Sequence, residues 1–259
     1  IPGSSMRGVW RAHLERNLRG RLAAEPRICD PLEEEAGAPH RGCSSVLGKT
    51  TAHFVPYQAS CPICKLFGCT VQASRLSIGD GERTTPPTGG IVVREHVRIK
   101  RRTGQGDRPL RFYGLQGAVF QVPIRLRNFE LWHLGLLAEL FDDLGHERVP
   151  LGSGKNKGYG RVKGTLTDVV LTYIGLTAPD SRLLGVAEHP QWGREFIRRY
   201  NLTAVRNPPA VTVLESVGSL PWRQVRRLDP VNFLQVCLDV PVPLGTFDPL
   251  SHRPGLEVA

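Results

Sequence analysis

Lysine is scarce in this sequence, and long apolar segments are missing from it. Only six of the 34 Lys and Arg residues are lysine. No uninterrupted apolar run approaches the roughly 18 residues that a membrane span needs, so we expect no membrane partner. Hydrophobic residues make up 40% of the chain and charged residues 22%, a composition that excludes wholesale disorder.

We also expect no signal peptide. The chain opens at Ile1 with neither a basic n-region nor an apolar h-region, so we expect a cytoplasmic protein. Its 259 residues allow one large domain or two small ones, with ample material for a hydrophobic core.

Arginine carries most of the positive charge. The sequence has 28 arginines, and its 34 basic residues exceed its 24 acidic ones to give a formal net charge of +10. Guanidinium groups bind phosphate oxygens in pairs and stack on bases, which favours a nucleic-acid partner over an anionic membrane. A GC-rich genome would also enrich arginine, without any functional cause.

Residues 1–22 predict an amphipathic helix with an arginine-rich polar side. Its apolar residues recur at helical spacing: Met6, Val9, Trp10, Leu14, Leu18 and Leu22. The other faces carry Arg7, Arg11, Arg16, Arg19 and Arg21. A helix N-terminus offers free amides and a favourable dipole to an anion, although Ser4 or Ser5 could simply cap the helix.

Four cysteines in the irregular segment 26–90 predict a metal site. Cys61 and Cys64 form a C-x2-C turn, with Cys29 and Cys43 upstream. Four thiolates suit tetrahedral zinc, which would order a segment with little periodicity of its own. His40, His53 or Cys69 could replace one ligand. A redox pair and unligated buried cysteines are the alternatives, and Cys237 is expected in the core.

Residues 94–111 predict an exposed basic hairpin with glycines near its tip. Its basic residues are Arg94, Arg98, Lys100, Arg101, Arg102, Arg108 and Arg111. Such a protrusion can reach phosphates, and Phe112 and Tyr113 are available to stack on bases. An ordinary solvated hairpin would show the same pattern.

The segment 151–161 predicts a cationic glycine loop. It contains Gly-Ser-Gly-Lys but is no phosphate loop for ATP, because Val149 stands at the first glycine position and Asn156 follows the lysine. Its glycines with Lys155, Lys157 and Arg161 suit an RNA backbone better than ATP.

The order of elements predicts an α+β fold. After the first helix come strands beginning at Ile91 and spanning residues 117–124, a helix over residues 131–144 ended by Gly145, the glycine loop, and a strand over residues 162–174. This is a βαββαβ ferredoxin-like unit without its first strand. Residues 175–259 form a C-terminal extension, with a helix expected over residues 192–200 and strands near residues 210–214 and 233–240.

Separate motifs resemble one protein family. Residues 1–8 (IPGSSMRG) look like the IPGSSLKG opening of the first helix in RAMP-superfamily backbone subunits of type III CRISPR–Cas effector complexes. Residues 61–68 (CPICKLFG) with Ser74-Arg75-Leu76 resemble their CPICRLFG and SRL segments. Residues 99–104 (IKRRTG) resemble their IDRxTG stretch, and residues 152–160 resemble their glycine-rich loop. Together these motifs span residues 1–174.

The resemblance implies a fold and a set of partners. The fold is an RRM-like palm over residues 1–174 that holds guide RNA, with a zinc-stabilised insertion at 26–90, a thumb hairpin at 97–113 that disrupts pairing, and the extension. The partners are CRISPR guide RNA, target RNA and other RAMP subunits or domains stacked into a filament. Guide contacts fall on Ser4, Ser5, Arg7, Lys155, Lys157 and Tyr159. With the basic residues above, the expected RNA-binding set adds Arg11, Arg98, Lys100, Arg101, Arg102, Thr103 and Arg161.

Catalysis departs from the family pattern. Members that cut target RNA use an aspartate in a loop before the IPGSS motif, and this sequence lacks that loop. Asp30, Asp80 and Asp107 match no catalytic position, so we name no catalytic residue and leave cleavage open. The alternatives to a guide-binding subunit are an endoribonuclease of target or precursor guide RNA, with His13 as candidate base, and a non-catalytic docking domain.

Overall fold

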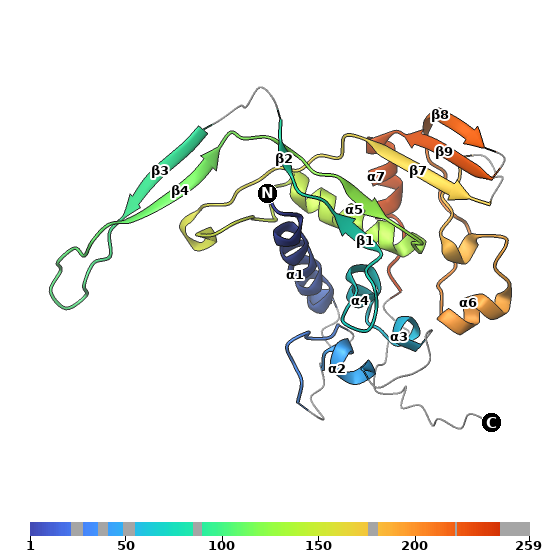
Figure 1. Cartoon of the computed structure of the whole chain (residues 1–259), viewed down its shortest axis with the longest axis horizontal. Coiled ribbons are helices and arrows are strands. Elements are labelled where there is room, and N and C mark those ends of the chain that lie inside the picture. Colours follow the sequence, from blue (N-terminus) through green and yellow to red (C-terminus); the bar gives the residue numbers. More distant parts are fainter. Residues whose placement is uncertain are drawn as a thin grey trace. The chain divides into compact units, whose positions relative to one another are not determined.

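The computed structural model describes residues 1–21, 28–35, 41–48, 55–84, 90–175, 181–220 and 222–243 (Figure 1). The chain divides into two compact units. The first comprises Ile1–Arg7 and Ile78–Ile124, and the second comprises Gly8–Ser77 and Arg125–Ala259. Among the described residues, no helix is both long and apolar enough to span a membrane.

The first helix, α1 (Gly3–Arg21), forms as predicted. Its apolar stripe is buried through Met6, Trp10, Leu14 and Leu18. The helix starts in a tight site, because a Cβ on Gly3 would lie 2.3 Å from the carbonyl oxygen of Ile78. Only glycine therefore fits the first turn of α1 without a shift of the backbone beside it.

Helix α5 (Leu131–Gly145) buries ten of its 15 residues. It packs against α7 (Pro230–Leu238) at Gly135, where a Cβ would lie 2.7 Å from the carbonyl oxygen of Val240. The lack of a side chain at this position lets the two elements approach closely.

Residues 233–240 do not form the strand that the sequence predicted, because α7 covers most of them. The side chain of Asp229 caps this helix by accepting a hydrogen bond from the backbone N–H of Asn232, and Pro230 occupies its first turn. The cap and the proline at its start therefore favour a helix over a strand for this short apolar run.

The predicted irregular segment 26–90 contains short regular elements. These are α2 (Cys43–Leu47), α3 (Val55–Gln58), α4 (Pro62–Phe67), β1 (Leu76–Ile78) and β2 (Glu82–Arg83). Most of the α4 side chains are buried, so this segment has a packed interior of its own.

The strands form four separate sheets among the described residues. Strand β1 pairs with β6 (Ile124–Leu126), and β2 pairs with β5 (Phe120–Gln121). Strand β3 (Gly90–His96) pairs with β4 (Leu110–Gln116), and β9 (Arg223–Leu228) lies between β7 (Val169–Ile174) and β8 (Val213–Leu220). These small sheets confirm the α+β class, whereas the continuous ferredoxin-like palm stays a prediction.

The β3–β4 hairpin forms where the sequence placed the basic hairpin (Figure 1). Its strands pair from Gly90 opposite Gln116 to His96 opposite Leu110, and residues 97–109 form the tip. The hairpin is therefore longer than the predicted 97–113. Near its tip, the rings of His96 and Phe112 meet edge to face at 5.0 Å.

Strand β7 covers only the second half of the predicted 162–174. In the extension, β8 begins within the predicted 210–214 and continues to Leu220, and β9 was not predicted. Between β7 and β8 lie η2 (Val186–Glu188) and α6 (Arg194–Tyr200), which confirms the helix predicted over 192–200.

Candidate metal centre and RNA-binding surfaces

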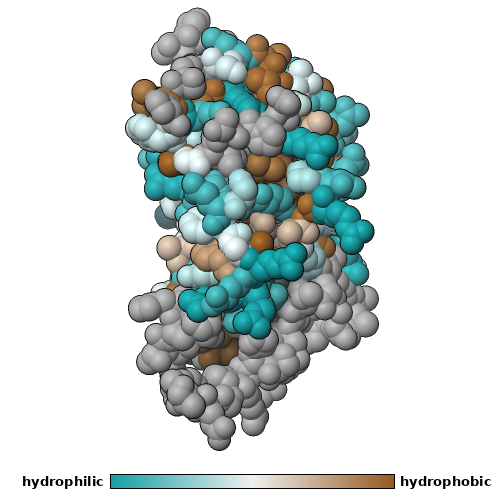
Figure 2. Space-filling view, turned by 90° about the vertical axis from the view of Figure 1, so that its right-hand side faces the viewer, coloured by the Kyte–Doolittle hydropathy of each residue, from teal (hydrophilic) through white to brown (hydrophobic). Residues whose placement is uncertain are grey.

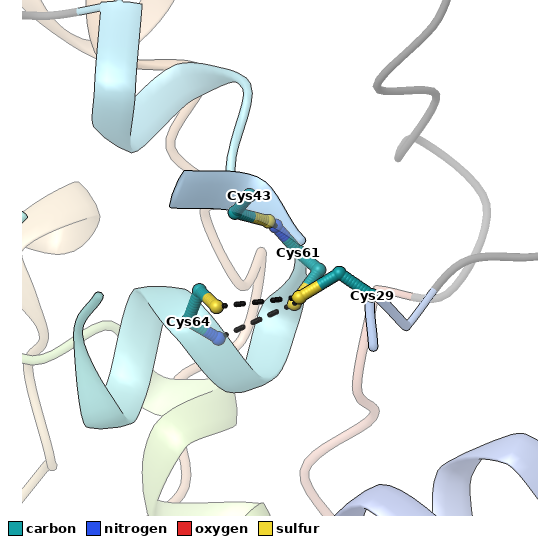
Figure 3. Close-up of side chains that lie close together, drawn as sticks. All are labelled: Cys29, Cys43, Cys61 and Cys64. Atoms are coloured by element: carbon teal, nitrogen blue, oxygen red, sulfur yellow. Dashed lines mark hydrogen bonds between the residues drawn. The ribbon is translucent and has the colours of Figure 1, made fainter. Parts of the chain in front are cut away.

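Four buried cysteines converge on one point (Figure 3). Cys43 begins α2, Cys61 caps α4, Cys64 lies in the first turn of α4, and Cys29 comes from the segment that follows α1. Their sulfur atoms all lie within 4.8 Å of one another. Segments that are well separated in the sequence thus supply one cluster.

The spacing of these sulfur atoms fits a tetrahedral metal ion. The Sγ of Cys29 lies 3.6 Å from the Sγ of Cys64 and 3.6 Å from the Sγ of Cys61. Zinc–sulfur bonds of about 2.3 Å in tetrahedral geometry place neighbouring sulfurs about 3.8 Å apart. A disulfide would need about 2.05 Å, so four thiols around one point favour a metal site over a redox pair.

Electrostatics within the cluster favour thiolate at one position. Hydrogen bonds from Cys43, Cys61 and Cys64 lower the pKa of Cys29, whereas burial opposes this shift. A thiolate is the form that binds a metal ion. The four side chains are therefore compatible with a metal centre in both geometry and chemistry.

Two arginines of α1 hold the cysteine cluster. Arg11 donates from Nη2 to the Sγ of Cys64 over 3.3 Å and from Nη1 to the carbonyl oxygen of Gly68 over 2.9 Å. Arg19 donates from Nη2 to the carbonyl oxygen of Cys29 over 2.8 Å. These contacts favour a structural role for Arg11, and its predicted RNA contact stays a prediction. The sequence offers no signal for these contacts.

The alternative ligands do not join the cluster in the described part of the chain. Cys69 is half-buried and lies outside the group of four, although a hydrogen bond with Cys64 lowers its pKa to about 6. His40 and His53 lie outside the described residues. Cys237 is buried in α7, as expected of a core residue.

The tip of the β3–β4 hairpin exposes the predicted basic residues. Arg98, Lys100, Arg101, Arg102 and Thr103 are all exposed. Among the described residues, no acidic partner forms an ion pair with the four basic ones, whereas Arg111 nearer the base pairs with Glu95 at 2.8 Å. The tip therefore presents uncompensated positive charge to solvent.

The glycine loop folds around η1 (Lys155–Lys157). Gly154 and Gly158 flank it with φ of 70° and 80°, a left-handed conformation that glycine adopts without strain. Lys155 and Lys157 are exposed, while the ring of Tyr159 packs over Gly154. Arg161 forms an ion pair with Glu147, whose Oε2 lies 2.9 Å from its Nε.

The start of α1 is less open to anions than the sequence suggested. Its backbone N–H at Gly3 donates to Oδ1 of Asp80 over 2.8 Å, and the N–H groups of Ser5 and Met6 donate to the carbonyl oxygen of Pro2. The hydroxyl-bearing residues Ser4 and Ser5 are exposed. Asp80 was missed by sequence reasoning because 77 positions separate it from Gly3.

His13 is buried against α5. Its Nε2 lies 2.7 Å from Oδ2 of Asp143, and Asn17 donates to the same oxygen over 3.1 Å. Arg148 donates to the other oxygen of Asp143 over 3.0 Å. This arrangement ties α1 to α5 and does not favour His13 as a base for RNA cleavage.

The predicted site residues thus form separate groups. The cysteines, Arg11 and the glycine loop belong to the second unit, and the hairpin tip belongs to the first.

The family model of the RAMP superfamily (RAMPs) matches residues 1–163, a range that includes all of these groups. No curated protein matches the sequence. The chain therefore belongs to the RAMP superfamily, whose members are CRISPR-associated and bind RNA.

Proposed function

We propose that this chain binds CRISPR guide RNA as a backbone subunit, or one backbone domain, of a type III effector ribonucleoprotein. In this role it captures target RNA together with guide RNA and contacts other RAMP subunits or domains. The observation that carries the proposal is the exposed tip of the β3–β4 hairpin, where Arg98, Lys100, Arg101 and Arg102 have no acidic partner among the described residues. A protrusion of this charge can follow an RNA backbone.

The glycine loop supports the same function from the second unit. Lys155 and Lys157 are exposed on a turn that Gly154 and Gly158 form in the left-handed conformation. Ser4, Ser5 and Arg7 at the start of α1 complete the proposed guide contacts. Residues 1–174 would then act as an RRM-like palm, with residues 90–116 as its thumb.

Zinc is the proposed occupant of the cysteine cluster. Cys29, Cys43, Cys61 and Cys64 would hold it, and the ion would supply structural cross-linking rather than chemistry at the RNA. Such a cross-link would join α2, α4 and the segment at residues 28–35. Reduced thiols of this kind persist in the cytoplasm, which is the proposed location of the complex.

Co-expression with a CRISPR array tests this function. The purified chain should carry repeat–spacer RNA, and nuclease protection of that RNA should give a regularly spaced footprint. Protein that binds RNA without preference for repeat–spacer sequence, or that leaves no footprint, would contradict the guide-binding role. Cleavage stays open, because no residue of the described chain is placed as its acid, base or metal ligand.

A further inference from the structure

Four aromatic rings follow one another in the C-terminal extension. The rings of Trp192 and Phe196 are stacked, with centroids 4.5 Å apart and an interplanar angle of 19°. Phe196 continues to Tyr200 at 4.8 Å, and Trp192 continues to His189 at 6.0 Å. Phe196 and Tyr200 lie one turn apart on one side of α6 (Arg194–Tyr200), and Trp192 lies just before the N-cap residue Gly193 of that helix. We call these four residues the aromatic ladder.

One end of the aromatic ladder is fixed to the core. Phe196 and Tyr200 pack against the buried cluster of Tyr57, Ala187 and Leu202. The chain after α6 is held as well, because buried Glu130 accepts a hydrogen bond from the backbone N–H of Thr203 over 2.6 Å. Helix α6, which carries Phe196 and Tyr200 of the ladder, is therefore held against the core.

The other end of the aromatic ladder is open to solvent. The side chain of Trp192 is 42% exposed. An open depression of about 520 Å³ lies beside Phe196 and Tyr200 of the ladder and is also lined by Gly193, Glu195 and Arg199.

Helix α6 carries a net positive charge. Arg194, Arg198 and Arg199 are exposed on α6, and Glu195 is the one acidic residue of that helix. Glu195 lies 3.1 Å from the guanidinium of Arg199. On the side of the molecule that carries α6, strongly hydrophilic residues surround small hydrophobic areas (Figure 2).

We propose that the aromatic ladder is a second RNA-binding site, which stacks an unpaired base on Trp192 and binds the adjoining phosphates through the arginines of α6. Exposed aromatic faces beside cationic side chains are the combination that binds single-stranded nucleic acid without sequence preference. A protein partner is less favoured, because the three exposed arginines of α6 suit phosphate better than an apolar surface. The proposal rests on RNA binding by the chain but not on the hairpin, and it lies outside the family match at residues 1–163.

Binding of a fluorescein-labelled single-stranded RNA to the full chain tests the site. We expect Trp192→Leu to raise the Kd by about fivefold or more, because a stacked base contributes about 1–3 kcal/mol. Leucine keeps an apolar contact with Phe196 but offers no π face. Trp192→Phe should restore most of the affinity. Trp222→Leu is the matched control, since Trp222 is a comparably exposed tryptophan beside an arginine, 54% exposed with Arg223 at 5.4 Å.

The salt dependence of the Kd for RNA distinguishes base stacking from phosphate contacts. Arg198→Gln should reduce the slope of log Kd against log salt by about 0.7, whereas Trp192→Leu should leave it unchanged. Unchanged RNA affinity of folded Trp192→Leu protein would overturn the proposal, and so would an equal decrease in Trp222→Leu. If instead only hairpin variants bind RNA more weakly, the guide-binding proposal survives while this one fails.

Discussion

The Nη2 of Arg11 donates a hydrogen bond to the Sγ of Cys64 over 3.3 Å, so a helix that the sequence marked for RNA also supports the cysteine cluster. Burial lowers the pKa of the Arg11 guanidinium, but its electrostatic interactions and hydrogen bonds with Cys64 and Glu15 outweigh this and raise the pKa above its ordinary value. Arg11 therefore stays charged beside the thiols. A fixed positive charge stabilises thiolate, the form that a metal ion needs.

Replacing Arg11 by Met should weaken metal binding by about 10- to 100-fold, the range found when groups that contact a ligand are removed. Chelator competition measures the affinity, and the charge-transfer band of cobalt-substituted protein should shift because the sulfur loses its donor. Arg16→Met is the control, since among the described residues exposed Arg16 donates only to the carbonyl oxygen of Ala12 in its own helix. Equal affinities in both variants would exclude a role for Arg11 at the cluster.

Cys61→Ser should abolish a zinc content of about one ion per chain and lower the melting temperature, because the ion joins segments that are distant in sequence. Elemental analysis and thermal melting measure the two effects. Cys69→Ser should leave both unchanged, since Cys69 lies outside the group of four. A zinc-free Cys69→Ser protein would show that the ligand set is different.

Arg101→Glu should lower the affinity for single-stranded RNA and reduce the salt slope of log Kd by about 0.7 for each phosphate that the protein no longer neutralises. Fluorescence anisotropy over a range of salt concentrations gives both quantities. Arg16→Glu makes the same charge change on α1 and should have a smaller effect. A similar decrease in both variants would mean that net charge alone, rather than the hairpin tip, governs the affinity.

Gly135→Ala should destabilise the protein although alanine is the better helix former. A Cβ there would lie 2.7 Å from the carbonyl oxygen of Val240, so α5 and the end of α7 would have to separate. Gly8→Ala in α1 is the matched control, because its Cβ meets nothing within 4 Å. It should stabilise the helix by about 0.5–1 kcal/mol. Denaturant unfolding of both variants measures the contrast, and the same sign of change in both would contradict the close packing of α5.

Asp143→Asn should cost about 1–2 kcal/mol at neutral pH, because it removes a charged acceptor from a partly buried network. Burial raises the pKa of Asp143, but hydrogen bonds from His13, Arg148 and Asn17 lower it below its ordinary value of 3.8. Stability from a lowered carboxyl pKa is present above the unfolded value and is lost as pH falls through the folded value. The difference between wild type and variant should therefore shrink below about pH 4.

Denaturant unfolding at several pH values measures this difference. The exposed pair of Asp168 with Arg227, 3.1 Å apart, provides the control. Asp168→Asn should change stability by less than about 1 kcal/mol, as expected of a surface ion pair. A pH-independent difference for Asp143→Asn would argue against an ionised Asp143 in the network.

Local patterns predicted several of the longer regular elements but not α2, α3 and α4. The helical spacing of Met6, Trp10, Leu14 and Leu18 predicted α1, and the C-x2-C turn with two upstream cysteines predicted the ligand set that the structure brings together. Strand β7 came out shorter than predicted, and residues 233–240 were wrongly assigned to a strand. A short apolar run fits both the helical and the strand period. Only its N-terminal cap and its packing against α5 therefore decide that it forms a helix.

Residue types and their spacing along the chain were enough to establish the family, the positive charge, the amphipathic helices and the identity of the four cysteines. They were not enough to establish what the arginines of α1 do. A helix presents side chains on all its faces, and which face meets another segment depends on how the whole chain packs. Arg11 and Arg19 lie against the cysteine cluster, and Asp80 caps the start of α1, only because chain segments distant in sequence fold onto them.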